Sequence, residues 1–172
     1  QSHVVRNLVA ALSSDQFIQL NAFLDATVGA TLTDRTTGDR AQTEYPMSVR
    51  FRDSNGEIEL SAAGAGLVNL IALFASLSRW QSESSKRGIL FLLDEPEAHL
   101  HPRLQAESAE RLSRLVTGDF AAQLILATHS VDILNRLATV GASLLRCDRQ
   151  QTPSVVSLDN DAKLFDDLAE WV

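Results

Sequence analysis

A chain of 172 residues is long enough to bury one sizeable core and too short for two comfortable domains. Its hydrophobic fraction of 45% and charged fraction of 22% lie near globular averages, which excludes a disordered or fibrous protein. Fifteen basic against twenty-two acidic residues give a net charge of -7, which argues against a broad non-specific nucleic-acid surface on this segment.

The first sixty residues change from a helical pattern to a strand pattern. Apolar residues recur at helical spacing over Ser13–Val28, with capping residues at 13–15 and Gly29 as the stop. Short β-prone runs follow over 30–60, and the Asp-Ser-Asn-Gly sequence at 53–56 predicts a hairpin between the last two runs.

A cluster of very small residues, Leu60 to Gly66, opens directly into a predicted helix from Leu67 to about Trp80. Small residues at a helix N-terminus leave backbone N–H groups bare, so a phosphate can come close. The alternative is a tight turn with a small-residue helix contact, which this stretch by itself favours. A polar surface loop is predicted over 81–87.

An unbroken apolar run, Ile89 to Leu93, leads directly into two carboxylates, Asp94 and Glu95. Such a run predicts a parallel strand that is covered on both faces by helices. Ligands of such sheets bind at the carboxyl ends of the strands. We therefore expect Asp94 and Glu95 to stand at a binding site, where paired acids most often handle a metal ion and a water.

A second apolar strand, Ala121 to Thr128, stops at His129 and Ser130. A helix that begins at Pro102 and ends at Gly118 connects the two strands. Strand, helix and strand form a βαβ unit, so the strands should run parallel with both tips at one edge of the sheet. The sequence therefore predicts that His129 lies near the acidic pair.

The last quarter of the chain predicts a helix at 131–137, two antiparallel edge strands at 142–147 and 153–158, and an acidic helix at 161–171. The prediction is one α/β domain over residues 1–172, with a mainly parallel core sheet flanked by helices and with antiparallel edge strands.

The order of these elements resembles the ATP-binding-cassette (ABC) type of P-loop ATPase. The order resembles in particular the non-transporter branch, which includes RecF, the structural-maintenance-of-chromosomes (SMC) proteins and the overcoming-lysogenization-defect (OLD) nucleases. Two phrases carry the resemblance: Asp-Glu-Pro-Glu-Ala-His-Leu-His-Pro at 94–102 and Ala-Thr-His-Ser at 127–130. It extends over roughly Ile58 to Leu137 and implies the C-terminal lobe of an ABC-type P-loop NTPase.

The resemblance implies a role for each matched residue. Asp94, at the end of the Walker B strand 89–95, would hold Mg²⁺ through its water shell, and Glu95 would polarise the attacking water. His129 would be the switch histidine that contacts the γ-phosphate. The D-loop would span 98–101, with His101 as a candidate contact, and would lie across a dimer interface.

The signature loop of the family would lie at about 60–66 and would clasp the γ-phosphate of a nucleotide held by the opposite subunit. Its candidate contacts are Ser61, Ala63, Gly64 and Gly66. Leu-Ser at 60–61 matches the usual Leu-Ser-Gly-Gly-Gln, although Ala63 stands where glycine is expected. Gly-Ala-Gly at 64–66 fits the looser OLD-like form, so two registers that differ by one residue stay open.

None of the eight glycines lies in the phosphate-cradling sequence Gly-x-x-x-x-Gly-Lys-Ser/Thr. We therefore expect the chain's own N-terminal Walker A lobe to lie outside this sequence, as its first partner. The absence of an initiator methionine before Gln1 and the patterned end at Val172 also suggest a fragment, which would be inactive alone.

The function implied by the resemblance is ATP binding and hydrolysis, with ATP and Mg²⁺ as cofactors. The head would close as an ATP-sandwiched homodimer serving DNA repair, chromosome handling or an anti-phage nuclease, with DNA or a nuclease domain as further partners in the parent protein. One alternative is a non-hydrolysing module that dimerises or recruits an effector. Another is a metal-dependent hydrolase built on Glu97, His99 and His101.

Cysteine usage and hydropathy indicate the compartment. Cys147 is the single cysteine, so no internal disulfide can form, which fits a reducing compartment. No stretch has the length of a membrane-spanning helix, and the N-terminus lacks the pattern of a signal peptide. We expect a cytoplasmic protein with no membrane partner.

Overall fold

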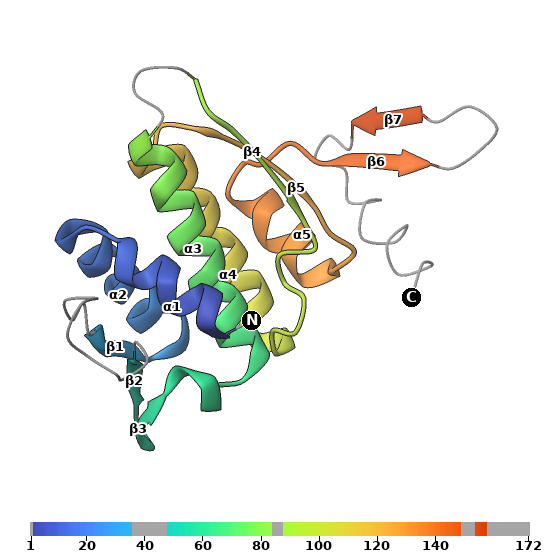
Figure 1. The fold of residues 1–172 in the computed structure, drawn as a ribbon. Coiled ribbons are helices and arrows are strands. Elements are labelled where there is room, and N and C mark those ends of the chain that lie inside the picture. Colours follow the sequence, from blue (N-terminus) through green and yellow to red (C-terminus); the bar gives the residue numbers. More distant parts are fainter. Residues whose placement is uncertain (1, 36–47, 84–87, 149–153, 158–172) are drawn as a thin grey trace.

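A computed structural model describes residues 2–35, 48–83, 88–148 and 154–157, and it has the α/β architecture predicted (Figure 1). The elements are, in chain order, α1 (Ser2–Ala11), α2 (Ser14–Val28), β1 (Thr31–Arg35), β2 (Val49–Asp53), β3 (Gly56–Glu59), the 3-10 turn η1 (Leu60–Ala62), α3 (Ala65–Glu83), β4 (Leu90–Asp94), α4 (Pro102–Arg114), the π-helical turn η2 (Leu115–Asp119), β5 (Gln123–Ala127), α5 (Val131–Thr139), β6 (Leu145–Asp148) and β7 (Ser154–Ser157). The predicted acidic helix at 161–171 lies outside the described residues.

Local capping explains the boundaries of α2. The Ser13 hydroxyl accepts a hydrogen bond from the Gln16 amide, and the Gln16 side chain accepts one from the Ser13 amide, which forms a capping box. Gly29 ends the helix in the left-handed conformation, with a φ of 65°. These contacts confirm the predicted helix and select Ser13 as its N-cap.

Helix α1 was not predicted, although its apolar residues have helical spacing. Val5 and Val9 of α1 and Leu12 just after it are all buried, four and three residues apart, in the same core as α2 and α3. The sequence also placed the start of a polar loop too early, because α3 continues to Glu83. The remaining loop residues, 84–87, lie outside the described part of the chain.

Helix α3 is the centre of the main core. Phe74 and Ile71 are fully buried on it, and the Phe74 ring lies 5.2 Å from that of Phe23 on α2. Phe91 of β4 belongs to the same cluster, so the core joins the N-terminal helices to the strand that carries the acidic pair. Within the described residues, no helix combines the length and apolarity needed to cross a membrane.

The described strands form three small sheets. The antiparallel sheet β1-β2-β3 contains the predicted hairpin, in which Asp53 pairs with Gly56. Strands β6 and β7 pair antiparallel, as predicted. Strands β4 and β5 pair parallel, also as predicted, with Leu92 opposite Ile125 and Asp94 opposite Ala127.

The prediction that β4 is covered on both faces is wrong for the described structure. Phe91 faces the core and is buried, but Leu90 and Leu92 on the other face are 49% and 69% exposed. Ile125, the neighbour of Leu92 on β5, is 57% exposed. Because side chains alternate along a strand, these three residues share one face, which we call the open face.

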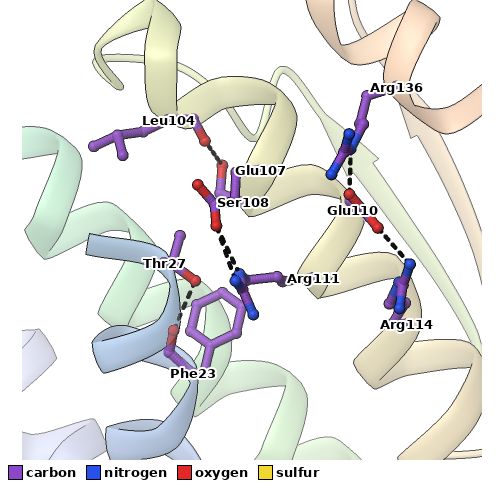
Figure 2. A network of polar contacts seen from close by, with 9 residues as sticks. All are labelled: Phe23, Thr27, Leu104, Glu107, Ser108, Glu110, Arg111, Arg114 and Arg136. Atoms are coloured by element: carbon purple, nitrogen blue, oxygen red, sulfur yellow. Dashed lines mark hydrogen bonds and ion pairs between the residues drawn. The ribbon is translucent and has the colours of Figure 1, made fainter. Parts of the chain in front are cut away.

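The Glu110 carboxylate of α4 forms a hydrogen bond with Arg136 of α5, as Figure 2 shows. Glu110 is buried, accepts a hydrogen bond from Arg136 of α5 and lies 2.6 Å from Arg114 of its own helix. The hydrogen bond from Arg136 is the main reason that the pKa of Glu110 is lowered. By contrast, the neighbouring pair of Glu107 and Arg111 lies within α4 and is half-exposed.

We predict that Glu110→Gln lowers the free energy of unfolding at neutral pH by about 1–3 kcal/mol, because it weakens hydrogen bonds to a buried charge. The pKa of Glu110 is lowered in the fold from 4.5. Its stabilising effect should therefore be complete above about pH 4.5 and be lost as the carboxyl becomes protonated below it. Urea unfolding at several pH values measures both effects.

The matched control is Glu107→Gln, which removes an exposed pair on the same helix and should cost at most about 0.5 kcal/mol. Equal losses in the two variants would contradict a special role of Glu110.

Candidate functional site

The carboxyl ends of β4 and β5 meet at one edge of their sheet. Asp94 pairs with Ala127, and the Glu95 amide donates a hydrogen bond of 2.9 Å to the Ala127 carbonyl. The loop that carries His129 begins one residue later. The predicted βαβ geometry is thus confirmed, and the acidic pair and His129 lie at the same edge.

Glu95 and His129 are in direct contact. The Nδ1 atom of His129 lies 2.5 Å from Oε1 of Glu95. The hydrogen bond and the charge of Glu95 raise the pKa of His129, although the His129 side chain is 85% exposed. The imidazole and the carboxyl group therefore form a hydrogen-bonded pair at the sheet edge, with the imidazole largely exposed.

The backbone of the turn after β4 is unusual. Glu95 has a φ of 48° and His99 a φ of 68°, both in the left-handed region that few non-glycine residues adopt. The Ala98 amide donates to the Glu95 carbonyl at 3.0 Å, and the Leu100 amide donates to the Glu97 carbonyl at 2.8 Å, so two successive turns span Glu95 and His99. Backbone conformations of this kind cluster at functional sites, and the sequence contained no signal for them.

A third acid, Glu97, is buried beneath the exposed pair. It is only 5% exposed and accepts a hydrogen bond from the Thr128 hydroxyl. Sequence reasoning considered Glu97 only as a metal ligand and missed this contact, because the contact joins residues 31 positions apart.

The alternative metal site on Glu97, His99 and His101 is not formed. In the described chain, the group that could hold a cation is Glu95, Glu97 and His129, whose ligand atoms lie within 4.8 Å of one another. His99 and His101 are exposed, and the His101 ring caps α4 by accepting from the Arg103 amide at 3.3 Å. Asp94 is exposed on the open face, and its carboxylate oxygens are of the kind that Mg²⁺ prefers.

The small-residue loop before α3 carries the signature-loop candidates. Ser61 is exposed, and both its amide and its hydroxyl donate to the carboxylate of Glu59, the amide at 2.7 Å. Arg6 of α1 lies 2.8 Å from the same carboxylate. Burial raises the pKa of Glu59, but the hydrogen bonds from Arg6 and Ser61 outweigh it and lower this pKa to about 2.

Gly66 connects this loop to the turn after β4. A Cβ at Gly66 would lie 2.5 Å from the carbonyl oxygen of His99, a distance that no side chain tolerates. Glycine is thus required by a contact inside this chain. Gly64, at the start of α3, has open space instead, and Ala63 is half-buried.

Residues 13–135 match the family model described as "AAA domain, putative AbiEii toxin, Type IV TA system". The Old nuclease of Escherichia phage P2 is 36% identical to this chain over 66 residues, which cover 38% of the chain and 11% of the nuclease. The match therefore spans about a tenth of the length of that relative.

Solved SMC structures share the fold. A chain from "Structural biochemistry of ATP-driven dimerization and DNA stimulated activation of SMC ATPases" aligns with a TM-score of 0.61 at 17% identity, over 91% of this chain and 93% of that one. The Smc head domain from Pyrococcus yayanosii with a coiled coil and joint aligns with a TM-score of 0.62 at 17% identity, over 92% of this chain and 28% of that one. The Smc head domain from Pyrococcus furiosus, bound to the C-terminal domain of ScpA, aligns with a TM-score of 0.58 at 17% identity, over 92% of this chain and 37% of that one.

We predict that Gly66→Ala lowers the free energy of unfolding by about 1–3 kcal/mol, the usual cost of forcing atoms into a packed contact. The new methyl group must displace the backbone at His99, because no flexible side chain can yield instead. Denaturant unfolding measures the loss.

Gly118→Ala is the control, because Gly118 has open space around a new Cβ and no positive φ. This variant should be neutral or slightly more stable. If Gly66→Ala behaved like Gly118→Ala, the contact with His99 would be refuted.

Proposed function

Because this chain belongs to the AAA-domain family that matches its residues 13–135, within the OLD/SMC-like ABC-type P-loop ATPases, we propose that it is the C-terminal lobe of an ATPase head. The observation that supports this proposal best is the meeting of Asp94, Glu95 and His129 at one sheet edge, with Glu95 and His129 in contact at 2.5 Å. Joined to its Walker A lobe, the head would bind ATP and hydrolyse it to ADP and phosphate.

The two contacting residues suit different parts of hydrolysis. Glu95 offers a carboxylate that can orient the attacking water and accept its proton. His129 has a raised pKa, so its imidazole stays protonated at higher pH than usual and favours an anionic phosphate. A phosphate that takes the imidazole as partner would free Glu95 for the water. Asp94 would hold a Mg²⁺ ion, which neutralises phosphate charge when bound.

The open face fits the missing half of the site. Leu90, Leu92 and Ile125 expose an apolar surface directly beside Asp94. Burial of this surface would stabilise an assembly with a second lobe. We infer that the Walker A lobe covers it and brings the phosphate-binding loop to the carboxyl edge of β4.

Dimer closure is the second element of the proposal. Two segments would contact a nucleotide held by a second copy. They are the D-loop at 98–101, which includes His101, and the signature loop with its candidates Ser61, Ala63, Gly64 and Gly66. The contact of Gly66 with His99 joins these two segments within one chain. Cycles of ATP binding and release would serve DNA repair, chromosome handling or a nuclease, in line with the nuclease and SMC relatives.

One observation favours a non-hydrolysing interaction module as the second candidate. The hydroxyl of Ser61 already donates to Glu59, so a phosphate at this place would have to displace a carboxylate. A lobe of this kind would dimerise or recruit an effector without turnover.

Hydrolysis tests the first proposal directly. The Walker A lobe is supplied in trans or by fusion, and phosphate release is followed. Glu95→Gln should lower kcat by roughly 100-fold or more, because a positioned general base contributes about 100- to 10,000-fold. Glu107→Gln on the surface of α4 is the matched control and should hydrolyse ATP normally. Undiminished hydrolysis by the Glu95 variant would remove the catalytic assignment.

A surface substitution tests the docking of the second lobe. Leu92→Asn should leave the free energy of unfolding within about 0.5 kcal/mol, because the side chain is largely exposed. It should weaken binding of the Walker A lobe about 10-fold or more, as measured by calorimetry. Ile18→Asn, at an equally exposed residue of α2, should bind normally. Equal binding by both variants would place the lobe elsewhere.

A further inference from the structure

Glu97 belongs to a closed ring of hydrogen bonds beneath the candidate site. Its Oε1 atom accepts from the Thr128 hydroxyl, and the Thr128 hydroxyl oxygen accepts from the Ser130 amide at 3.0 Å. The Ser130 hydroxyl donates to Oε1 of Gln105 at 2.8 Å. Gln105 in turn donates to the Leu100 carbonyl at 3.2 Å, and the Leu100 amide donates to the Glu97 carbonyl at 2.8 Å.

This ring joins three separate segments. Glu97 and Leu100 lie in the turn after β4, Thr128 and Ser130 lie in the loop after β5, and Gln105 lies in the first turns of α4. His129 stands between two members of the ring, so its backbone is held on both sides. Leu100 lies in the segment 98–101 that would face a second subunit.

We propose that Glu97 is a positioning residue that couples His129 to the segment 98–101. This inference rests on the proposed ATPase function, because it assigns to that site the link between phosphate contact and the partner-facing turn. The hydrogen bond from Thr128 to Glu97 holds the loop in which His129 contacts Glu95. Through Leu100, the same ring sets the turn whose His99 carbonyl contacts Gly66.

The burial of Glu97 supports this role. Its Oε2 atom is buried and has no hydrogen-bond partner among the described residues, while Oε1 bonds to Thr128. A buried carboxylate oxygen without a partner destabilises a fold. A residue needed only for packing would be apolar here, since the surroundings include Leu70, Leu73 and Ile133. The hydrogen bond from Thr128, and the ring that includes it, account for the presence of an acid at this buried position.

The experiment uses the assembled protein and four variants. Thr128→Val keeps the shape of the side chain but removes the hydroxyl, Glu97→Ala removes the acceptor, and Glu97→Gln retains an amide oxygen that can accept. Thr117→Val is the matched control, because the exposed Thr117 hydroxyl donates to a backbone carbonyl, that of Ser113, four residues earlier. The readouts are kcat and KM for ATP and, without nucleotide, the exchange rate of the Leu100 amide by NMR.

We expect Thr128→Val and Glu97→Ala to lower kcat about 10-fold or more while KM changes less than about 2-fold, since hydrogen bonds to charged groups are strong. Both should accelerate exchange of the Leu100 amide about 3-fold or more, although this amide donates to the Glu97 backbone carbonyl, which neither substitution removes. Glu97→Gln should restore most of both properties, and Thr117→Val should change neither.

Three outcomes decide between the proposals. Wild-type kcat and wild-type Leu100 exchange in Thr128→Val and Glu97→Ala would overturn the role of Glu97. Faster exchange of the Leu100 amide in Thr128→Val, with no hydrolysis even by the wild type, would support the coupling and refute the ATPase proposal. A fall in kcat with unchanged Leu100 exchange would refute coupling to the segment 98–101.

Discussion

The in-register parallel pairing of β4 with β5 is the constraint on which the rest of the structure depends. It places Asp94 opposite Ala127, so the turn that carries Glu95 and the loop that carries His129 leave the sheet at the same level. The core maintains this register, because Phe91 is buried in the main hydrophobic cluster. A slip of one residue would turn Phe91 outward and Asp94 inward, which exchanges an apolar contact for a buried charge.

Helix contacts then fix the loops that follow the two strands. Glu110 of α4 bonds to Arg136 of α5, so the two helices that follow β4 and β5 are joined to each other. The close approach of Gly66 to the His99 carbonyl ties the start of α3 to the turn after β4. Rigid helices therefore hold short segments whose backbone is strained at Glu95. This arrangement preorganises polar groups, as the proposed phosphate-handling role would require.

In the proposed assembly, the open face would explain how a chain with a good core contributes only half of a site. One side of β4 and β5 contributes to the main core through Phe91, while Leu92 and Ile125 on the other side remain exposed. An apolar surface beside a carboxylate is suited to a protein partner that carries the ligand. The assembly that buries Leu92 would also complete the surroundings of Asp94, so the contact that stabilises the assembly would also complete the site.

The sequence by itself determined the local elements and their order. Ser13 and Gln16 cap α2 through contacts three residues apart, and two apolar strands joined by one helix dictate a parallel pair, so the meeting of Glu95 and His129 could be predicted. Only the tertiary structure decided which face of β4 is covered, since Leu92 and Phe91 are equally apolar in the sequence. It also decided the burial of Glu97 and the contact that requires glycine at position 66. These features depend on packing between residues distant along the chain, which local spacing does not encode.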